Sequence, residues 1–139
     1  MISNALPLLS IVVLLFPMFV FTLASPPLLV LKHDTPLDGR FVRNLFNLYY
    51  IVVITIATVD AVGFAIKGQV AMVLALVALI AFVFGIRRWI ISKMDKLREA
   101  IARGEATAVP EFKRMHIAAI ILNVLQLGTV AAGMTRLAV

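Results

Sequence analysis

Residues 45–91 decide the fold, and they read LFNLYYIVVITIATVDAVGFAI, then KGQ, then VAMVLALVALIAFVFGIRRWII. The two apolar segments are 22 residues each, residues 45–66 and residues 70–91. At about 1.5 Å per residue, each is long enough for a helix to cross a hydrocarbon core about 30 Å thick. The three residues between them, Lys67-Gly68-Gln69, allow only a tight turn. The stretch therefore predicts two antiparallel neighbouring membrane helices.

Two further apolar segments flank this hairpin, residues 6–31 before it and residues 115–135 after it. Lipid admits only helices or closed barrels, and these runs lack the alternation of barrel strands. We therefore predict an all-α integral membrane four-helix bundle, a single transmembrane domain over residues 1–139. No basic residue precedes the first segment, and two prolines follow it, so we expect an uncleaved spanning helix. Pro26 and Pro27 are expected to end or distort it.

The composition supports a membrane protein. Of 139 residues, 63% are hydrophobic and 14% charged, whereas soluble domains have about 45–50% apolar and 25% charged residues. Disordered proteins, nucleic-acid-binding domains and disulfide scaffolds are excluded, so no nucleic-acid partner is expected. The net charge is +6, and the basic residues stand beside the apolar segments in the sequence. This arrangement indicates contact between the basic side chains and anionic lipid headgroups.

The lysines and arginines predict the orientation. Eleven of the thirteen flank or lie in the first and third connections. They are Lys32, Arg40, Arg43, Arg87, Arg88, Lys93, Lys96, Arg98, Arg103, Lys113 and Arg114. Only Lys67 and Arg136 fall on the other side. The positive-inside rule then places both connections in the cytoplasm and both termini outside it, in a multi-pass protein of the inner (cytoplasmic) membrane.

The connection between the third and fourth helices is expected to be long, helical and cytoplasmic. Residues 92–104 form an amphipathic extension in which Met94, Leu97 and Ile101 share one face. Such a face indicates an extension lying on the lipid headgroups or, alternatively, docking a partner.

Asp60 is the only charged residue well inside an apolar segment. An intramembrane carboxylate is a candidate functional group, here for proton coupling or cation handling. The alternative is a carboxylate near the outer interface that reaches water or pairs with Lys67.

The last segment carries a stripe of polar and small residues. Its members, His116, Ala119, Asn123, Gln126 and Gly133, fall within roughly 100° of one another on a helix. Such a stripe faces protein and predicts interhelical hydrogen bonds; a substrate or ion path is the alternative. The second segment offers a matching face in Asn47, Tyr50, Thr58 and Ala61, and the two faces are expected to pack together.

His33 and His116 are both expected near the cytoplasmic interface, where two histidines could ligate a haem or a pigment. His33 lies in a loop rather than on a helix face, so capping, headgroup contact or hydrogen bonding is the expected use. No cofactor and no metal are therefore predicted. The chain contains no phosphate loop, HExxH or GxSxG motif, and no enzymatic activity is expected.

Two parts of the chain carry a family resemblance. One comprises Pro27-Leu28-Leu29, Gly39-Arg40, Leu45-Phe46 and Tyr49-Tyr50; the other comprises Phe112-Lys113-Arg114-Met115-His116 and Leu122-Asn123. Together they resemble the bacterial domain-of-unknown-function family 4149, which is similar to eukaryotic transmembrane protein 205. The resemblance implies a four-helix membrane fold, and it singles out Tyr49, Tyr50, His116 and Asn123. Leu29 departs from the family, which usually has an aromatic residue there.

The expected function is that of a non-enzymatic accessory, assembly or structural subunit. It would pack against other membrane-protein subunits or a second copy of itself, for example in a respiratory or photosynthetic complex. The alternative is a small oligomeric transporter or ion-conducting protein that uses Asp60 and the polar stripe. Small multidrug transporters also have four helices, but they rely on an acidic residue in the first helix, which this chain lacks.

Overall fold

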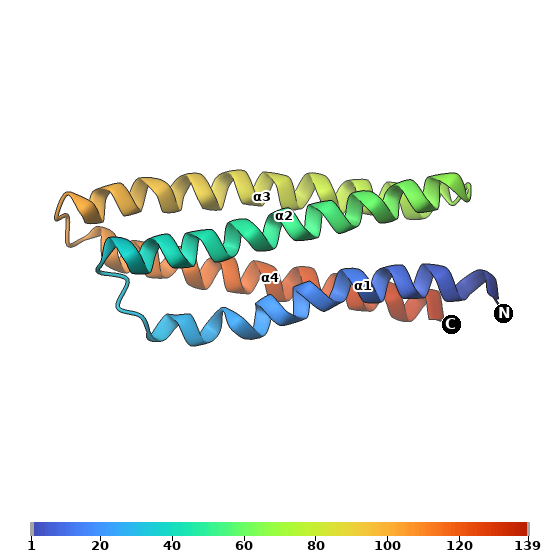
Figure 1. Ribbon diagram of the computed structural model, residues 1–139, viewed down its shortest axis with the longest axis horizontal. Helices are drawn as coiled ribbons and strands as arrows, with labels where there is room; N and C mark the ends of the chain where they lie inside the picture. The colour runs from blue at the N-terminus through green and yellow to red at the C-terminus, as the bar shows by residue number, and fades with distance from the viewer. Residues whose placement is uncertain (1, 139) are drawn as a thin grey trace.

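The computed structural model describes residues 2–138, which form four long helices and one short 3₁₀ helix (Figure 1). They are α1 (Ile2–Ala24), η1 (Pro26–Val30), α2 (Pro36–Ile66), α3 (Val70–Ala102) and α4 (Ala108–Ala138). No strand occurs among these residues. All four long helices are long and apolar enough to cross a membrane. The predicted all-α fold of four candidate membrane spans is thus confirmed.

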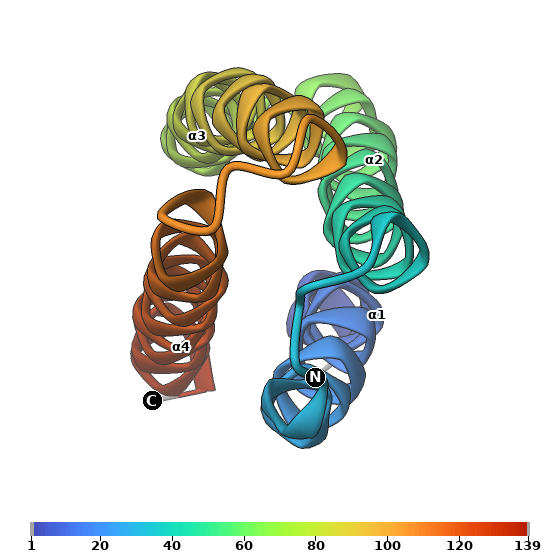
Figure 2. The ribbon, with the colours of Figure 1, turned by 90° about the vertical axis from the view of Figure 1, so that its left-hand side faces the viewer.

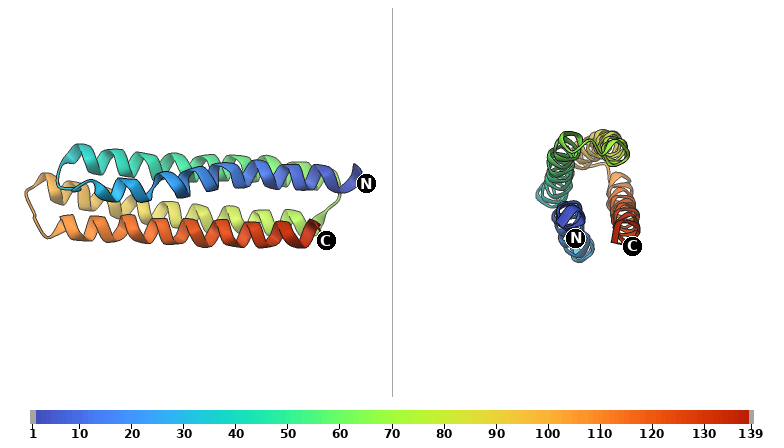
Figure 3. Two further views of the ribbon diagram at one scale, coloured as in Figure 1. Left: turned by 90° about the horizontal axis from the view of Figure 1, so that it is seen from below. Right: turned by 90° about the vertical axis from the view of Figure 1, so that its right-hand side faces the viewer.

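The helices surround one interior in chain order. Figure 2, which looks along the bundle, shows α1, α2, α3 and α4 following one another around it. The α2–α3 contact is the most extensive, and α1 packs against both α2 and α4. Consequently α2 and α4 lie diagonally across the interior, and only long side chains can join them. Both chain ends lie at the same end of the bundle (Figures 1 and 3).

The turn between α2 and α3 is as tight as its sequence predicts. Gly68 has φ +70°, a left-handed conformation that glycine adopts without steric cost. Its N–H donates to the Ala65 carbonyl at 3.0 Å, and the Gln69 N–H donates to the Phe64 carbonyl at 3.0 Å. These bonds satisfy the last carbonyls of α2 and send the chain straight back along it.

Each helix differs in length from the apolar segment that predicted it. α2 begins at Pro36 rather than residue 45, because Thr35 caps it. The Thr35 hydroxyl accepts a hydrogen bond from the Asp38 N–H at 3.2 Å, and proline suits the first helical position. α1 ends at Ala24, and Pro26 and Pro27 open η1 instead of continuing α1. Hydropathy marks the apolar part of a helix, whereas caps and prolines mark its ends.

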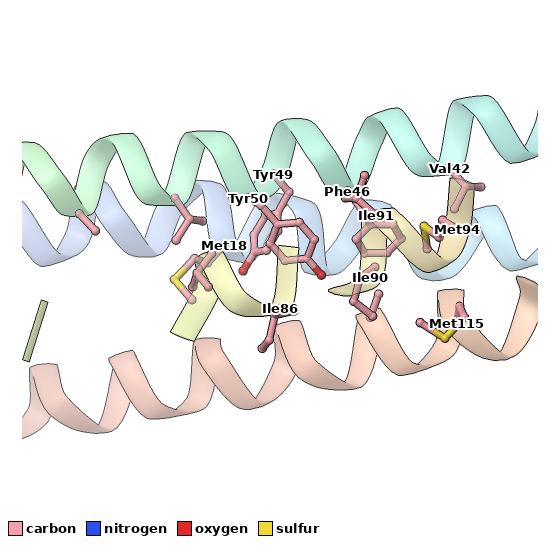
Figure 4. Packing of buried hydrophobic residues seen from close by; sticks show 14 of the residues in the cluster. Met18, Val42, Phe46, Tyr49, Tyr50, Ile86, Ile90, Ile91, Met94 and Met115 are labelled. Carbon is pink, nitrogen blue, oxygen red and sulfur yellow. The ribbon is translucent and has the colours of Figure 1, made fainter. Parts of the chain in front are cut away.

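The expected helix over residues 92–104 is present as far as Ala102, because α3 runs unbroken to that residue. The segment continues α3 directly, so the connection to α4 spans only residues 103–107 and is shorter than expected. Met94 is fully buried and Leu97 is buried in the same core as Val42 and Phe112. Figure 4 shows Val42 and Met94 near each other at this end of the core. The apolar face therefore packs inside the bundle, because α2 and α4 also extend to this level, and it does not lie on lipid headgroups.

Candidate functional site: a buried polar cluster

Besides Ser25, which is also buried, six polar or aromatic-polar side chains are buried in the interior. They are His33, Tyr49, Tyr50, His116, Asn123 and Gln126, and we call them the polar cluster. Five have no exposed surface, and Gln126 is 3% exposed. They come from the loop before α2, from α2 itself and from α4. Four of them, Tyr50, His116, Asn123 and Gln126, belong to the stripes identified in the sequence.

The two histidines bond to each other. His33 Nε2 and His116 Nδ1 are 3.0 Å apart, so one imidazole donates and the other accepts. His33 has φ +60°, a left-handed conformation that costs a non-glycine residue of order 1–3 kcal/mol. The prolines of η1 and the Thr35 cap fix the two ends of this short loop. The strained backbone between them directs the His33 side chain into the bundle.

Aromatic rings enclose the histidine pair. The Phe112 ring centroid lies 5.7 Å from that of His33, and the Phe46 centroid lies 5.4 Å from that of His116, nearly edge-on at 79°. Both phenylalanines are buried. The pair is thus shielded from solvent by apolar rings of α2 and α4.

Burial sets the protonation of His33, which lies outside the apolar spans. Burial lowers the pKa of His33 below its ordinary value of 6.5. The positive charge of Lys113 acts in the same direction, whereas the nearby backbone of Leu31 and the charges of Asp38 and Asp34 partly offset it. His33 is therefore neutral at pH 7, which suits a single N–H shared between two rings.

A second bond joins α2 and α4 across the diagonal. The Tyr49 hydroxyl donates to Gln126 Oε1 at 3.0 Å. Figure 4 shows the rings of Tyr49 and Tyr50 projecting from α2 toward α4. The two rings are 5.2 Å apart, and Phe21 of α1 lies 5.4 Å from Tyr49. Because α2 and α4 lie diagonally across the interior, a side chain as long as that of tyrosine is needed to join them.

Several atoms of the cluster find no protein partner among the described residues. They are Tyr50 Oη, Asn123 Oδ1 and Nδ2, and Gln126 Nε2. His33 Nδ1 and His116 Nε2 also lack a well-aligned hydrogen bond, although the carbonyls of Leu31 and Ser25 lie close to them. A buried polar atom without a partner costs about 1–3 kcal/mol. These donors and acceptors are therefore able to bind water or a small polar molecule.

The histidine geometry bears on the cofactor question. The observed 3.0 Å spacing is that of a hydrogen bond. Within the described part of the chain, no three His, Asp or Glu side chains gather as a metal site. The arrangement supplies a hydrogen bond between the loop before α2 and α4.

Asn47 and Thr58 are placed differently from the expected pairing of stripes. Asn47 Oδ1 accepts a hydrogen bond from Arg87 Nε at 3.1 Å, so it faces α3 rather than α4. Thr58 is exposed, and its hydroxyl donates to the Ile54 carbonyl of its own helix at 2.7 Å. The inward line of α2 is aromatic and apolar at this level, which leaves the small polar residues on its sides.

Asp60 lies apart from the polar cluster. It is half-buried on α2, and its carboxylate lies close to the Ser10 side chain of α1. None of the ion pairs found among residues 2–138 includes it, so the pairing with Lys67 is not formed. The buried residues of α2 nearest to it in sequence, Ala57, Ala61 and Phe64, belong to the apolar core.

Sequence reasoning missed an ionic link at the other end of α2. Arg43 donates to Asp95 through Nε at 2.9 Å and Nη2 at 3.2 Å, and Arg98 Nη1 lies 3.3 Å from the same carboxylate. Gly39 packs so near that a Cβ there would lie 3.0 Å from Arg98 Cγ. Arg43 and Asp95 are 52 residues apart in sequence, so no local pattern indicates their contact.

Comparison with known proteins yields no match: no family model, no curated protein and no solved structure is significantly similar to this chain. The resemblance to family 4149 stays a prediction.

Proposed function

We propose that this chain is a non-enzymatic accessory or assembly subunit of the cytoplasmic membrane. It would pack against a partner membrane protein, or a second copy of itself, through the outer face of α3. The eleven-to-two distribution of lysine and arginine supports an orientation with both termini outside the cytoplasm. Under the same proposal, the chain is related to family 4149.

The observation that carries the proposal is the exposure of α3. Only 11% of its most apolar stretch is buried within the chain, against 22% for α1 and 28% each for α2 and α4. This stretch of α3 is as apolar as that of α1, with a mean hydropathy of 2.6 against 2.5, and more apolar than those of α2 and α4. A strongly apolar stretch is thus left the least covered, which suits a helix with further neighbours in the membrane.

The outer face of α3 also has the side chains that helix docking needs. Ala71, Ala75 and Ala78 are exposed and recur at four- and three-residue intervals, so they lie within about 60° of one another. Small residues allow two helix backbones to approach closely in lipid. Leu74 and Val77, exposed at 64% and 51%, lie on one side of this line and provide larger apolar side chains beside it.

The test is cross-linking and native-gel migration of the full chain in mild detergent, with single leucines placed on this face. Ala75→Leu and Ala78→Leu should abolish the larger species by blocking close approach. Ala65→Leu, at an exposed alanine of α2, is the matched control and should leave it intact. A wild-type chain that migrates only as a free monomer, from membranes as well as after purification, would refute the accessory function.

A second candidate is a small oligomeric transporter or ion-conducting protein. It is favoured by Asp60, whose Oδ2 is buried without a partner, and by the unpaired polar atoms of α4. Flux through proteoliposomes carrying wild type or Asp60→Asn tests it. Equal flux in the two proteins removes Asp60 as the coupling residue, and the absence of flux in both removes this class.

A further inference from the structure

A shallow groove lies on the outer face of α3 where its apolar stretch ends. It has a volume of about 540 Å³ and is lined by Gly85, Arg88, Trp89, Ser92, Lys93 and Lys96. All six residues are exposed. Gly85, Trp89, Ser92 and Lys96 recur at i, i+4, i+7 and i+11, so the groove follows a single face of the helix.

The depth of the groove in the bilayer follows from the sequence of α3. Residues 70–86 contain no charged side chain, and at about 1.5 Å per residue they cover about 25 Å. The hydrocarbon core is about 30 Å thick, so Arg88 and Trp89 lie at the level where hydrocarbon gives way to headgroups. Trp89 is the only tryptophan of the chain and is 53% exposed, as is typical of that interface.

The charged side chains that line the groove are all positive. Three cations line it, Arg88, Lys93 and Lys96, and no acid does. Two acids, Asp95 and Glu99, line the adjoining groove, which shares Arg88, Ser92 and Lys96 with this one. Asp95 is held by Arg43 and Arg98. The three cations take part in none of the ion pairs found among residues 2–138. Their charge is therefore available to an anion from the membrane.

We propose that this groove is a specific site for an anionic phospholipid. The phosphate lies between Arg88, Ser92 and Lys96, which are spaced one helical turn apart and supply two cations and a hydroxyl. The acyl chain runs along Gly85 and the Trp89 ring toward the bilayer centre. Gly85 leaves room for it, since nothing lies within 4 Å of where its Cβ would be.

Trp89 provides the readout, because a single tryptophan reports contact with a quenching lipid. The full chain is reconstituted into phosphatidylcholine vesicles that contain either brominated phosphatidylglycerol or brominated phosphatidylcholine at equal mole fraction. Each cation near a phosphate contributes a preference of about fivefold. We expect brominated phosphatidylglycerol to occupy the groove at least about fivefold more strongly than brominated phosphatidylcholine.

Two triple variants separate a local site from general attraction. Replacing Arg88, Lys93 and Lys96 with glutamine should reduce the ratio of phosphatidylglycerol to phosphatidylcholine occupancy to about one. The control replaces Lys32, Arg40 and Arg114, which are exposed cations outside the groove, and should keep the preference within about twofold of wild type. Equal loss in both variants, or equal quenching by the two lipids in wild type, overturns the proposal.

A second pair of variants tests the shape of the groove without changing charge. Gly85→Leu fills the groove and should lower the preference, whereas Gly63→Leu on α2 should not. Both glycines are exposed and have nothing within 4 Å of the added Cβ, so both variants should fold. An unchanged preference in Gly85→Leu refutes the groove. If excess inorganic phosphate displaces the lipid, the site is one for free phosphate and the lipid assignment fails. These outcomes are independent of docking along Ala71–Ala78, which lie toward the other end of α3.

Discussion

Tyr49 and Tyr50 are adjacent, chemically identical and both without exposed surface, yet removing their hydroxyls should have opposite effects. The Tyr49 hydroxyl donates to Gln126 at 3.0 Å, whereas the Tyr50 hydroxyl has no partner among the side chains and backbone that the structure describes. Tyr49→Phe loses the bond and leaves a buried amide oxygen unpaired, which should lower the free energy of unfolding by about 1–2 kcal/mol. Tyr50→Phe removes an unpaired buried hydroxyl and should be neutral or stabilising by up to about 1 kcal/mol.

The assay is reversible unfolding in mixed micelles, followed by far-ultraviolet circular dichroism as the fraction of denaturing detergent rises. Phenylalanine preserves the ring and its packing, so each tyrosine serves as the control for the other. A double-mutant cycle of Tyr49→Phe with Gln126→Leu should give a coupling free energy of about 0.6–1.7 kcal/mol. Equal destabilisation by the two tyrosine variants, or zero coupling in the cycle, would refute the reasoning.

Three further predictions concern the ends of the helices. Burial lowers the pKa of His33 below 6.5. The free energy of unfolding should therefore be at its full value above pH 6.5 and should decline as the pH falls toward the folded-state pKa. Unfolding midpoints measured against pH should show this decline, and His33→Gln should make it shallower. Thr35→Ala removes the cap of α2 and should lower the free energy of unfolding by about 1 kcal/mol. The control is Thr58→Ala, which removes a hydroxyl that bonds only its own helix and should be closer to neutral in the same assay. Asp95→Asn weakens the ion pair with Arg43, in which the Arg43 side chain is 25% exposed and the Asp95 side chain 39%. The variant should lower the free energy of unfolding by only about 0.5 kcal/mol, because solvent screens such a pair. A loss several times larger would mean that solvent does not screen it.

The fold was readable from the sequence because lipid demands continuous apolar helices, and residues 45–91 meet that demand twice. The lengths of the helices were not readable in the same way. Hydropathy cannot show that α3 continues past its apolar stretch to Ala102, since the residues that stabilise this continuation lie on other helices. Met94 is buried only because α2 and α4 reach the same level.

The polar cluster was partly predictable. The stripe on the last segment identified His116, Asn123 and Gln126 because polar side chains in lipid must face protein. Their partners were harder to find, since a helical wheel separates Tyr49 from Tyr50 by about 100° and allows only one of them on a narrow face. In the structure the two rings lie on either side of the line from α2 to the bundle interior. Tyr49 contacts both Phe21 and Gln126. His33 meets His116 across 83 residues of sequence, through a left-handed backbone that no pattern indicates.

The unbroken course of α3 has a mechanical consequence. Its 33 residues measure about 50 Å, well beyond the hydrocarbon thickness of about 30 Å, and the last three turns are fastened to α2 through Asp95. α2 and α4 reach the same level as this end of α3, and Asp95 joins α3 to α2. A load applied there is therefore shared among the three helices, and the bundle should respond as one body rather than bend at α3 alone.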